Sequence, residues 1–294
     1  METNEPQPRR RIRAGRSIIS FVKEWGGIGT LLIALLYSFP SSVLDQWQKS
    51  KGQRQAAEKD ALASVRGSLS EMAALRAEKA SRLLQSSDAH YQNEISGAYD
   101  IRIYNLIYIR KDEFKNQAPK LRSSELYMVG SSLSLIGEIN EAQYYYDLAI
   151  VAAGKEQKPG TVITIYREKG NSLFQNSPDQ DIDKARSAYV SVLSLLSTDK
   201  SSYSRYTYVT DLSELIAFEM SNGDWQCGIS YRDYVNSLFQ QLNQKDNPFL
   251  SNYYKMFNEI KVPPRSGGGC PEKIPLHPAF APPDLPPGEL APTK

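Results

Sequence analysis

Cysteine and histidine are scarce in this sequence. The 294 residues include two cysteines, Cys227 and Cys270, and two histidines, His90 and His277. None of the four stands at a spacing typical of metal ligands, which argues against a zinc finger, an iron–sulfur cluster or a histidine-rich metal site. Two cysteines are also too few for a dense disulfide framework. A single bridge between Cys227 and Cys270 would suit an oxidising compartment, and two unpaired thiols are the alternative.

Motifs of known catalytic sites are missing as well. The sequence has no H-E-x-x-H and no G-x-S-x-G, and residues 266–273 lack the spacing and the final Lys-Ser/Thr of a phosphate-binding loop. Two imidazoles leave little room for a Ser–His or Cys–His pair. The 33 acidic residues offer many carboxylate pairs, but no pattern singles one out. We therefore predict a protein that is not an enzyme and uses no cofactor or metal, and carboxylate catalysis in a helical groove is the alternative.

The sequence also lacks a strong net charge. The chain carries +2 in total, although its first 24 residues hold six basic and three acidic side chains. The remaining body is close to neutral, which argues against a nucleic acid as its partner.

A long apolar stretch follows the basic end. Residues 25–44 (WGGIGTLLIALLYSFPSSVL) contain no ionisable side chain except Tyr37. Twenty helical residues span about 30 Å, the thickness of a bilayer's hydrocarbon core. Trp25 and Trp47 flank the stretch, as membrane-interface anchors do, and Pro40 is expected to kink the helix or end it early. The sequence predicts one transmembrane helix over 25–44. A buried helix of a soluble protein and a cleaved signal peptide are the alternatives.

Basic residues on the two sides of this stretch predict its orientation. Six lie before it and four follow it up to residue 64. The positive-inside rule therefore places residues 1–24 in the cytoplasm and the body outside, which in a bacterium means the periplasmic side of the inner (plasma) membrane.

The pattern of the body is all-α. Residues 45–120 are expected to form a long helix (54–86), rich in helix-forming residues, and a second helix (88–114). An apolar 3-4-3 spacing over two heptads favours packing of the long helix on the next one, with a coiled coil as the alternative. The residues of this apolar spacing are Leu62, Val65, Leu69 and Met72.

Small and large residues then recur at the spacing of a repeat. Residues 123–154 hold Leu126, Gly130, Leu133, Gly137, Ala142, Tyr146 and Ala149. These positions resemble the tetratricopeptide repeat (TPR), in which small residues let two helices approach and large residues fill the space between them. A second unit begins near Tyr166, a degenerate third one runs over 206–242, and 247–260 reads as a capping helix. Residues 121–261 are thus expected to form a TPR-like array, and an unrelated helical array of similar pitch is the alternative.

The resemblance also implies a binding surface. In TPR proteins the first helices of the repeats form a concave groove that binds peptides. The matching positions here are Tyr127, Ser131, Leu135, Arg167, Asn171 and Phe174. The stretch 166–174 (YREKGNSLF) is similar to the helix that clamps a C-terminal carboxylate in some of these proteins, but the first unit lacks matching residues.

Proline dominates the end of the chain. Residues 263–294 include ten of the seventeen prolines, which excludes helix there and predicts a disordered or polyproline-II tail over 262–294. We expect a solvated spacer. Two P-x-x-P sequences, at 275–278 and 283–286, offer recognition by an aromatic groove as the alternative.

Together these features predict a single-pass membrane protein whose TPR-like domain acts as a non-catalytic interaction scaffold, or as an assembly or chaperone-type adaptor. Its expected partners are a protein or peptide, and membrane lipid around residues 25–44. The alternative is a structural protein that self-associates as a homo-oligomer through the anchor and the long helix, with the repeats as a spacer.

Overall fold

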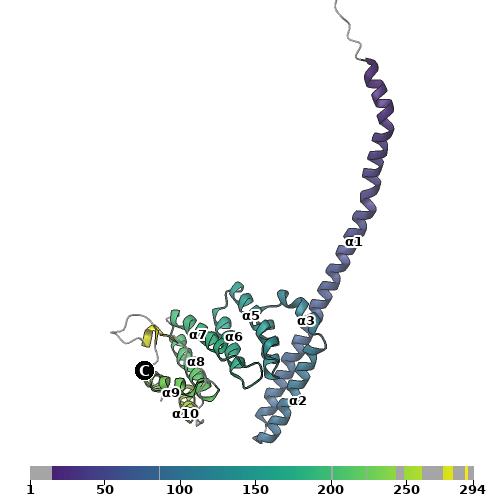
Figure 1. Ribbon diagram of the computed structural model, residues 1–294. Coiled ribbons are helices and arrows are strands. Elements are labelled where there is room, and N and C mark those ends of the chain that lie inside the picture. Colours follow the sequence, from purple (N-terminus) through teal and green to yellow (C-terminus); the bar gives the residue numbers. More distant parts are fainter. Residues whose placement is uncertain are drawn as a thin grey trace, which may run out of the picture. The chain divides into compact units, whose positions relative to one another are not determined.

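The computed structural model describes residues 15–85, 87–199, 201–222, 224–242, 248–259, 274–280 and 289–290, with most of their side chains from residue 46 onward. The chain divides into two compact units, Met1–Ala61 and Leu62–Lys294. Their boundary lies inside the long helix α1 (Gly15–Leu84) (Figure 1). As predicted, the architecture is all-α.

In the first unit, helix α1 begins at Gly15 and continues through Pro40, so this proline does not end the helix. The backbone of residues 25–44 belongs to α1, whereas the side chains of these residues, Trp25 among them, lie outside the described part. Trp47 is 59% exposed, and the Nζ atom of Lys51 lies 5.0 Å from the centre of its ring. None of the helices in the described part of the chain combines the length and the apolar character that crossing a membrane requires.

The second unit continues with helices that pack mainly on their neighbours in the sequence. After α1 come α2 (Ala89–Tyr108), α3 (Lys111–Gln117) and the 3-10 helix η1 (Ala118–Lys120). Three hairpins follow, formed by α4 (Ser123–Leu135) and α5 (Ile139–Lys155), α6 (Pro159–Phe174) and α7 (Ile182–Thr198), and α8 (Ser202–Ser221) and α9 (Trp225–Gln241). Helix α10 (Pro248–Glu259) packs on α8 and α9 (Figure 1). The stretch that was predicted as a repeat array, residues 121–261, is thus mainly helical in its described residues.

Two helix boundaries differ from the prediction. The expected helix over 88–114 is broken at Ile109–Arg110, between α2 and α3. The second hairpin begins at Pro159 and not near Tyr166, because proline is well suited to the first turn of a helix, where its missing N–H would have no partner anyway.

The apolar side chains of α1 pack against other parts of the same chain. Val65, Leu69 and Met72 are buried in a cluster with side chains of α2 to α5, and Leu62 packs against it. These residues therefore pack on other helices of the same chain, as predicted. A second cluster joins α7, α8, α9 and α10.

The segment that follows α10 corrects one prediction. Residues 274–280 were expected to be disordered or to adopt polyproline II, but β1 (Ile274–Pro275) pairs antiparallel with β2 (Glu289–Leu290), and Pro278–Phe280 form the 3-10 helix η3. Ile274, His277 and Phe280 are buried against the second cluster and α8. The prediction is wrong here because prolines exclude helix but permit a two-residue edge strand and a helix start.

Candidate functional site

Ionisable and hydroxyl side chains gather along α4, α6 and α8, the first helices of the three hairpins, together with one arginine of α1. Tyr127 and Glu168 interact electrostatically with Arg76 and Arg167, and Glu168 also interacts with Glu214. We call this set the polar face. It consists of Arg76, Tyr127, Ser131, Arg167, Glu168, Asn171, Asp211 and Glu214.

Arg76 connects α1 to α4. Its Nη2 atom donates to Ser131 Oγ at 3.1 Å, to Ser132 Oγ at 2.8 Å and, at 3.4 Å, to the carbonyl oxygen of Met128. Burial lowers the pKa of the Arg76 guanidinium. In the sequence, Arg76 only marks the position where the apolar 3-4-3 pattern ends. In the structure, its guanidinium donates a hydrogen bond to the hydroxyl of Ser131, one of the predicted groove residues.

Arg167 and Asp211 form an ion pair between α6 and α8. The distance from Arg167 Nη1 to Asp211 Oδ1 is 3.3 Å, and the side chains are 30% and 0% exposed respectively. Asp211 Oδ2 is buried and has no hydrogen-bond partner among the described residues. Burial raises the pKa of Asp211 to about 7, although the Arg167 guanidinium acts in the opposite direction.

Asn171 meets a buried tyrosine. The hydroxyl of Tyr189, on α7, lies within hydrogen-bonding distance of Asn171 Oδ1 and is 3.3 Å from Glu214 Oε2. Its single proton can serve one acceptor at a time. Burial raises the pKa of Tyr189 well above its ordinary value, so the hydroxyl stays protonated and acts as a donor to these groups.

Glu168 differs from the other carboxylates of the polar face. It is half-buried and has no hydrogen bond or ion pair with any described residue. Burial raises its pKa, and Glu214 adds to this effect, while Arg167 and Arg76 oppose it. Burial raises the pKa of Tyr127 as well, and the charge of Glu168 adds to this effect. Glu168 therefore contributes acceptor atoms that the described part of the chain does not use.

The structure brings together most, but not all, of the predicted groove residues. Tyr127, Ser131, Arg167 and Asn171 belong to the polar face. Phe174 does not, because it is fully buried and its ring stacks on Phe218 of α8, with centroids 5.2 Å apart and planes at 4°.

The remaining predicted groove residue, Leu135, lies at the end of α4 and is 58% exposed. Sequence reasoning missed Arg76, Glu168, Asp211 and Glu214. Only Glu168 had a local signal, since it lies within the predicted clamp stretch 166–174.

Two hollows in the surface of the described residues lie away from the polar face. One, with a volume of about 490 Å³, is lined by residues of α5, α6 and α7 such as Ile150, Val162 and Leu195. Another, of about 290 Å³, lies between η1, α4 and α5. Both linings are mainly apolar, and neither includes a residue of the polar face.

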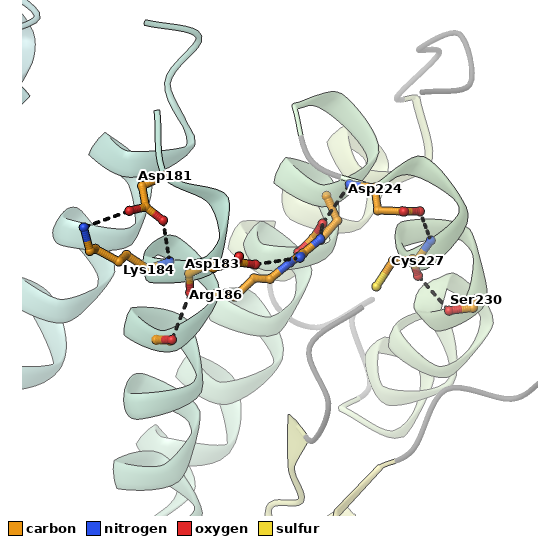
Figure 2. A network of polar contacts seen from close by, with 9 residues as sticks. Asp181, Asp183, Lys184, Arg186, Asp224, Cys227 and Ser230 are labelled. Atoms are coloured by element: carbon orange, nitrogen blue, oxygen red, sulfur yellow. Dashed lines mark hydrogen bonds and ion pairs between the residues drawn. The ribbon is translucent and has the colours of Figure 1, made fainter. Parts of the chain in front are cut away.

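A second polar cluster links α7, α8 and the start of α9 (Figure 2). Arg186 donates to both carboxylate oxygens of Glu219, at 2.6 and 2.9 Å, and to Asp183 at 3.2 Å. Glu219 also accepts from the backbone N–H of Asp224, and Asp224 caps α9 by accepting from the N–H of Cys227 (Figure 2). Because these polar groups are engaged with one another, we assign the cluster a structural role.

Few of the described residues are suited to metal or disulfide chemistry. In the described ranges, no group of three or more His, Cys, Asp or Glu side chains could hold a metal ion. Cys227 is disulfide-bonded. The only other cysteine of the sequence, Cys270, lies outside the described residues, so the Cys227–Cys270 pairing stays a prediction.

Compared with family models, with curated proteins and with solved structures, the chain has no match.

Proposed function

We propose that this chain is a non-catalytic interaction adaptor, which binds a polypeptide partner on the polar face of a TPR-like array. The observation that supports this best is Glu168, a half-buried carboxylate without a hydrogen bond or ion pair among the described residues. Partial burial removes some of the water around this carboxylate, and without a compensating donor this costs free energy. A partner that supplies N–H groups would recover this cost.

The charges of the polar face favour a basic partner segment. Arg76 is engaged with the hydroxyls of Ser131 and Ser132, and Arg167 with Asp211. Donors are thus in use, while Glu168 offers acceptors. The neighbouring ring of Tyr127 would also suit an ammonium or guanidinium group through a cation–π contact. We therefore propose a partner segment with a Lys or Arg side chain, rather than a C-terminal carboxylate.

The location is part of the same proposal. We propose that residues 25–44 anchor the chain in the inner membrane with residues 1–24 in the cytoplasm, on the grounds of their apolar composition and the flanking basic residues. We test this orientation with a reporter that is active only outside the cytoplasm, fused after residue 294. The proposed orientation predicts that this reporter is active. Activity of a cytoplasmic reporter at the same position would overturn the orientation.

The polar face is tested with Glu168→Gln. This variant keeps the shape of the side chain and removes its charge. We expect the yield of a partner cross-linked through a photoreactive residue at Leu135 to fall at least fivefold. Because burial already disfavours the charged carboxylate, the unfolding midpoint should stay the same or rise. A binding loss would then not be a folding loss.

Two controls make this test specific. Glu71→Gln removes an exposed carboxylate of α1 and should leave the cross-linking yield unchanged. A photoreactive residue at the exposed Ser187 of α7 should not capture the same partner. Equal yields for E168Q and the unsubstituted chain would refute the polar face as the binding surface.

A further inference from the structure

Residues 274–280 occupy a defined seat on the second unit. Ile274 and His277 are 0% and 1% exposed. The hydroxyl of Tyr208, on α8, donates to the carbonyl oxygen of Pro275 at 2.7 Å. The guanidinium carbon of Arg205 lies 5.5 Å from the ring centre of Phe280. A short peptide, which begins as strand β1 and ends in the 3-10 helix η3, is thus bound to a helix surface of the same chain, and we call it the tail segment.

His277 holds the tail segment as a neutral imidazole. Its Nδ1 atom accepts a hydrogen bond from the backbone N–H of Ala279 at 3.1 Å, so Nδ1 carries no proton. Its Nε2 atom lies 3.2 Å from both the carbonyl oxygen of Asp199 and Ser204 Oγ. Since a carbonyl oxygen can only accept, Nε2 carries the proton, and every partner of the ring is satisfied in this tautomer.

A second proton would disturb this arrangement. It would bind Nδ1 and place an N–H opposite the N–H of Ala279, so that one hydrogen bond would be lost. The resulting charge would also be buried, with the cationic Arg205 nearby. Burial accordingly lowers the pKa of His277.

The other polar groups around the ring do not offset this charge fully. The Asp199 carboxylate, at the end of α7, accepts from the N–H and hydroxyl of Ser201 at 2.9 and 3.0 Å. Burial raises the pKa of Tyr208 on α8 and of Tyr234 on α9, so both are neutral. On β2, Glu289 is paired in register with Pro275, and its side chain lies outside the described part of the chain.

We propose that the tail segment is an acid-sensitive latch, a peptide ligand that the chain itself supplies to α8 and that leaves its seat when His277 gains a proton. In the released segment, His277 titrates near its ordinary value of about 6.5. In the seated segment it takes up a proton only at lower pH. As the pH falls below about 6.5, proton binding therefore shifts the equilibrium toward release and exposes the apolar seat around Tyr208. This proposal does not depend on the polar face.

Methyl NMR of the full chain in detergent, with labelled isoleucine δ-methyl groups, tests the latch. Ile274 reports the seat and Ile216, fully buried in α8, reports the fold. Between pH 8 and 5 we expect the Ile274 signal to move to the position of an exposed isoleucine, while the Ile216 signal stays. The variant His277→Gln should lose this transition, whereas His90→Gln, which removes the exposed second histidine, should keep it.

Three results would overturn the proposal. They are an Ile274 signal that stays in place throughout, an unchanged transition in H277Q, and a joint shift of Ile274 and Ile216, which would mean global unfolding. Should H277Q leave the segment unseated at every pH, Arg205→Gln decides. Removing the neighbouring positive charge makes a seated imidazolium less unfavourable, so the transition of the His277-containing chain should move to lower pH, and an unchanged midpoint would contradict the latch.

Discussion

Two glycines set how closely the helices of the first two hairpins approach. Gly130 of α4 and Gly170 of α6 face the rings of Tyr146 and Tyr189 in the second helix of their hairpins. A Cβ atom at Gly170 would lie 2.7 Å from the Tyr189 ring, and one at Gly130 would lie 3.0 Å from Tyr146. The Tyr189 ring is fully buried and its hydroxyl is held near Asn171, so it has little freedom to move away.

Gly170→Ala should therefore destabilise the fold. Overpacking of a core contact typically costs about 1–3 kcal/mol, and we expect a loss of that size in the free energy of unfolding from urea denaturation. Gly154→Ala is the matched control, because Gly154 is also helical but a Cβ there meets nothing within 4 Å. It should be neutral or stabilise by up to about 1 kcal/mol, since alanine favours helix. Equal effects of the two substitutions would contradict the close approach.

At the level of helices, the Arg186–Glu219 pair ties the second hairpin to the third. Arg186 and Glu219 are 6% and 0% exposed, and their contact is bidentate. Figure 2 also shows the contact between Asp181 and Lys184, which belongs to α7 alone and whose lysine is 73% exposed. The Arg186–Glu219 and Lys184–Asp181 ion pairs therefore differ mainly in how deeply they are buried.

Glu219→Ala should cost much more stability than Lys184→Ala. Removing one partner leaves the Arg186 guanidinium buried without its main acceptor, which typically costs about 3–5 kcal/mol. Loss of the exposed Lys184 pair should cost at most about 1 kcal/mol. The double change Arg186→Met with Glu219→Leu should recover most of the loss, because no charge is then left buried. The free energies of unfolding of the three proteins test this, and a full loss in the double variant would refute it.

The helical hairpins could be predicted from the sequence, whereas the contacts between them could not. The spacing of Gly130, Ala142 and Tyr146 is local, and this spacing is enough to predict the first hairpin. The break at Ile109–Arg110 between α2 and α3 has no glycine or proline to signal it.

The candidate site shows the same limit. Arg76 reaches Ser131 across 55 positions of sequence, and Phe174 is covered by Phe218 of a later hairpin. Helical periodicity predicts which residues share a face, but the partner of that face depends on how distant helices pack.

For the molecule as a whole, the pH dependence of stability should contain two opposing contributions. Burial raises the pKa of Asp211 from an ordinary value of 3.8 to about 7. Between these values the folded chain holds a proton that the unfolded chain releases, so this group lowers stability as the pH rises from about 4 to about 7. His277 acts in the opposite sense, because its pKa is lowered in the fold and its contribution is lost as the pH falls below about 6.5.

Asp211→Asn separates the two contributions. The amide oxygen can still accept from Arg167, but the side chain no longer titrates. At about 1.4 kcal/mol per pKa unit, the contribution of Asp211 amounts to a few kcal/mol, and we expect D211N to lose this decline between pH 4 and 7. Urea denaturation at intervals of pH measures it, and Asp183→Asn, whose side chain is 92% exposed, should follow the unsubstituted chain. If D211N kept the full decline, the carboxylate of Asp211 would be ionised in the fold, and the Arg167 pair would be stronger than its single 3.3 Å contact indicates.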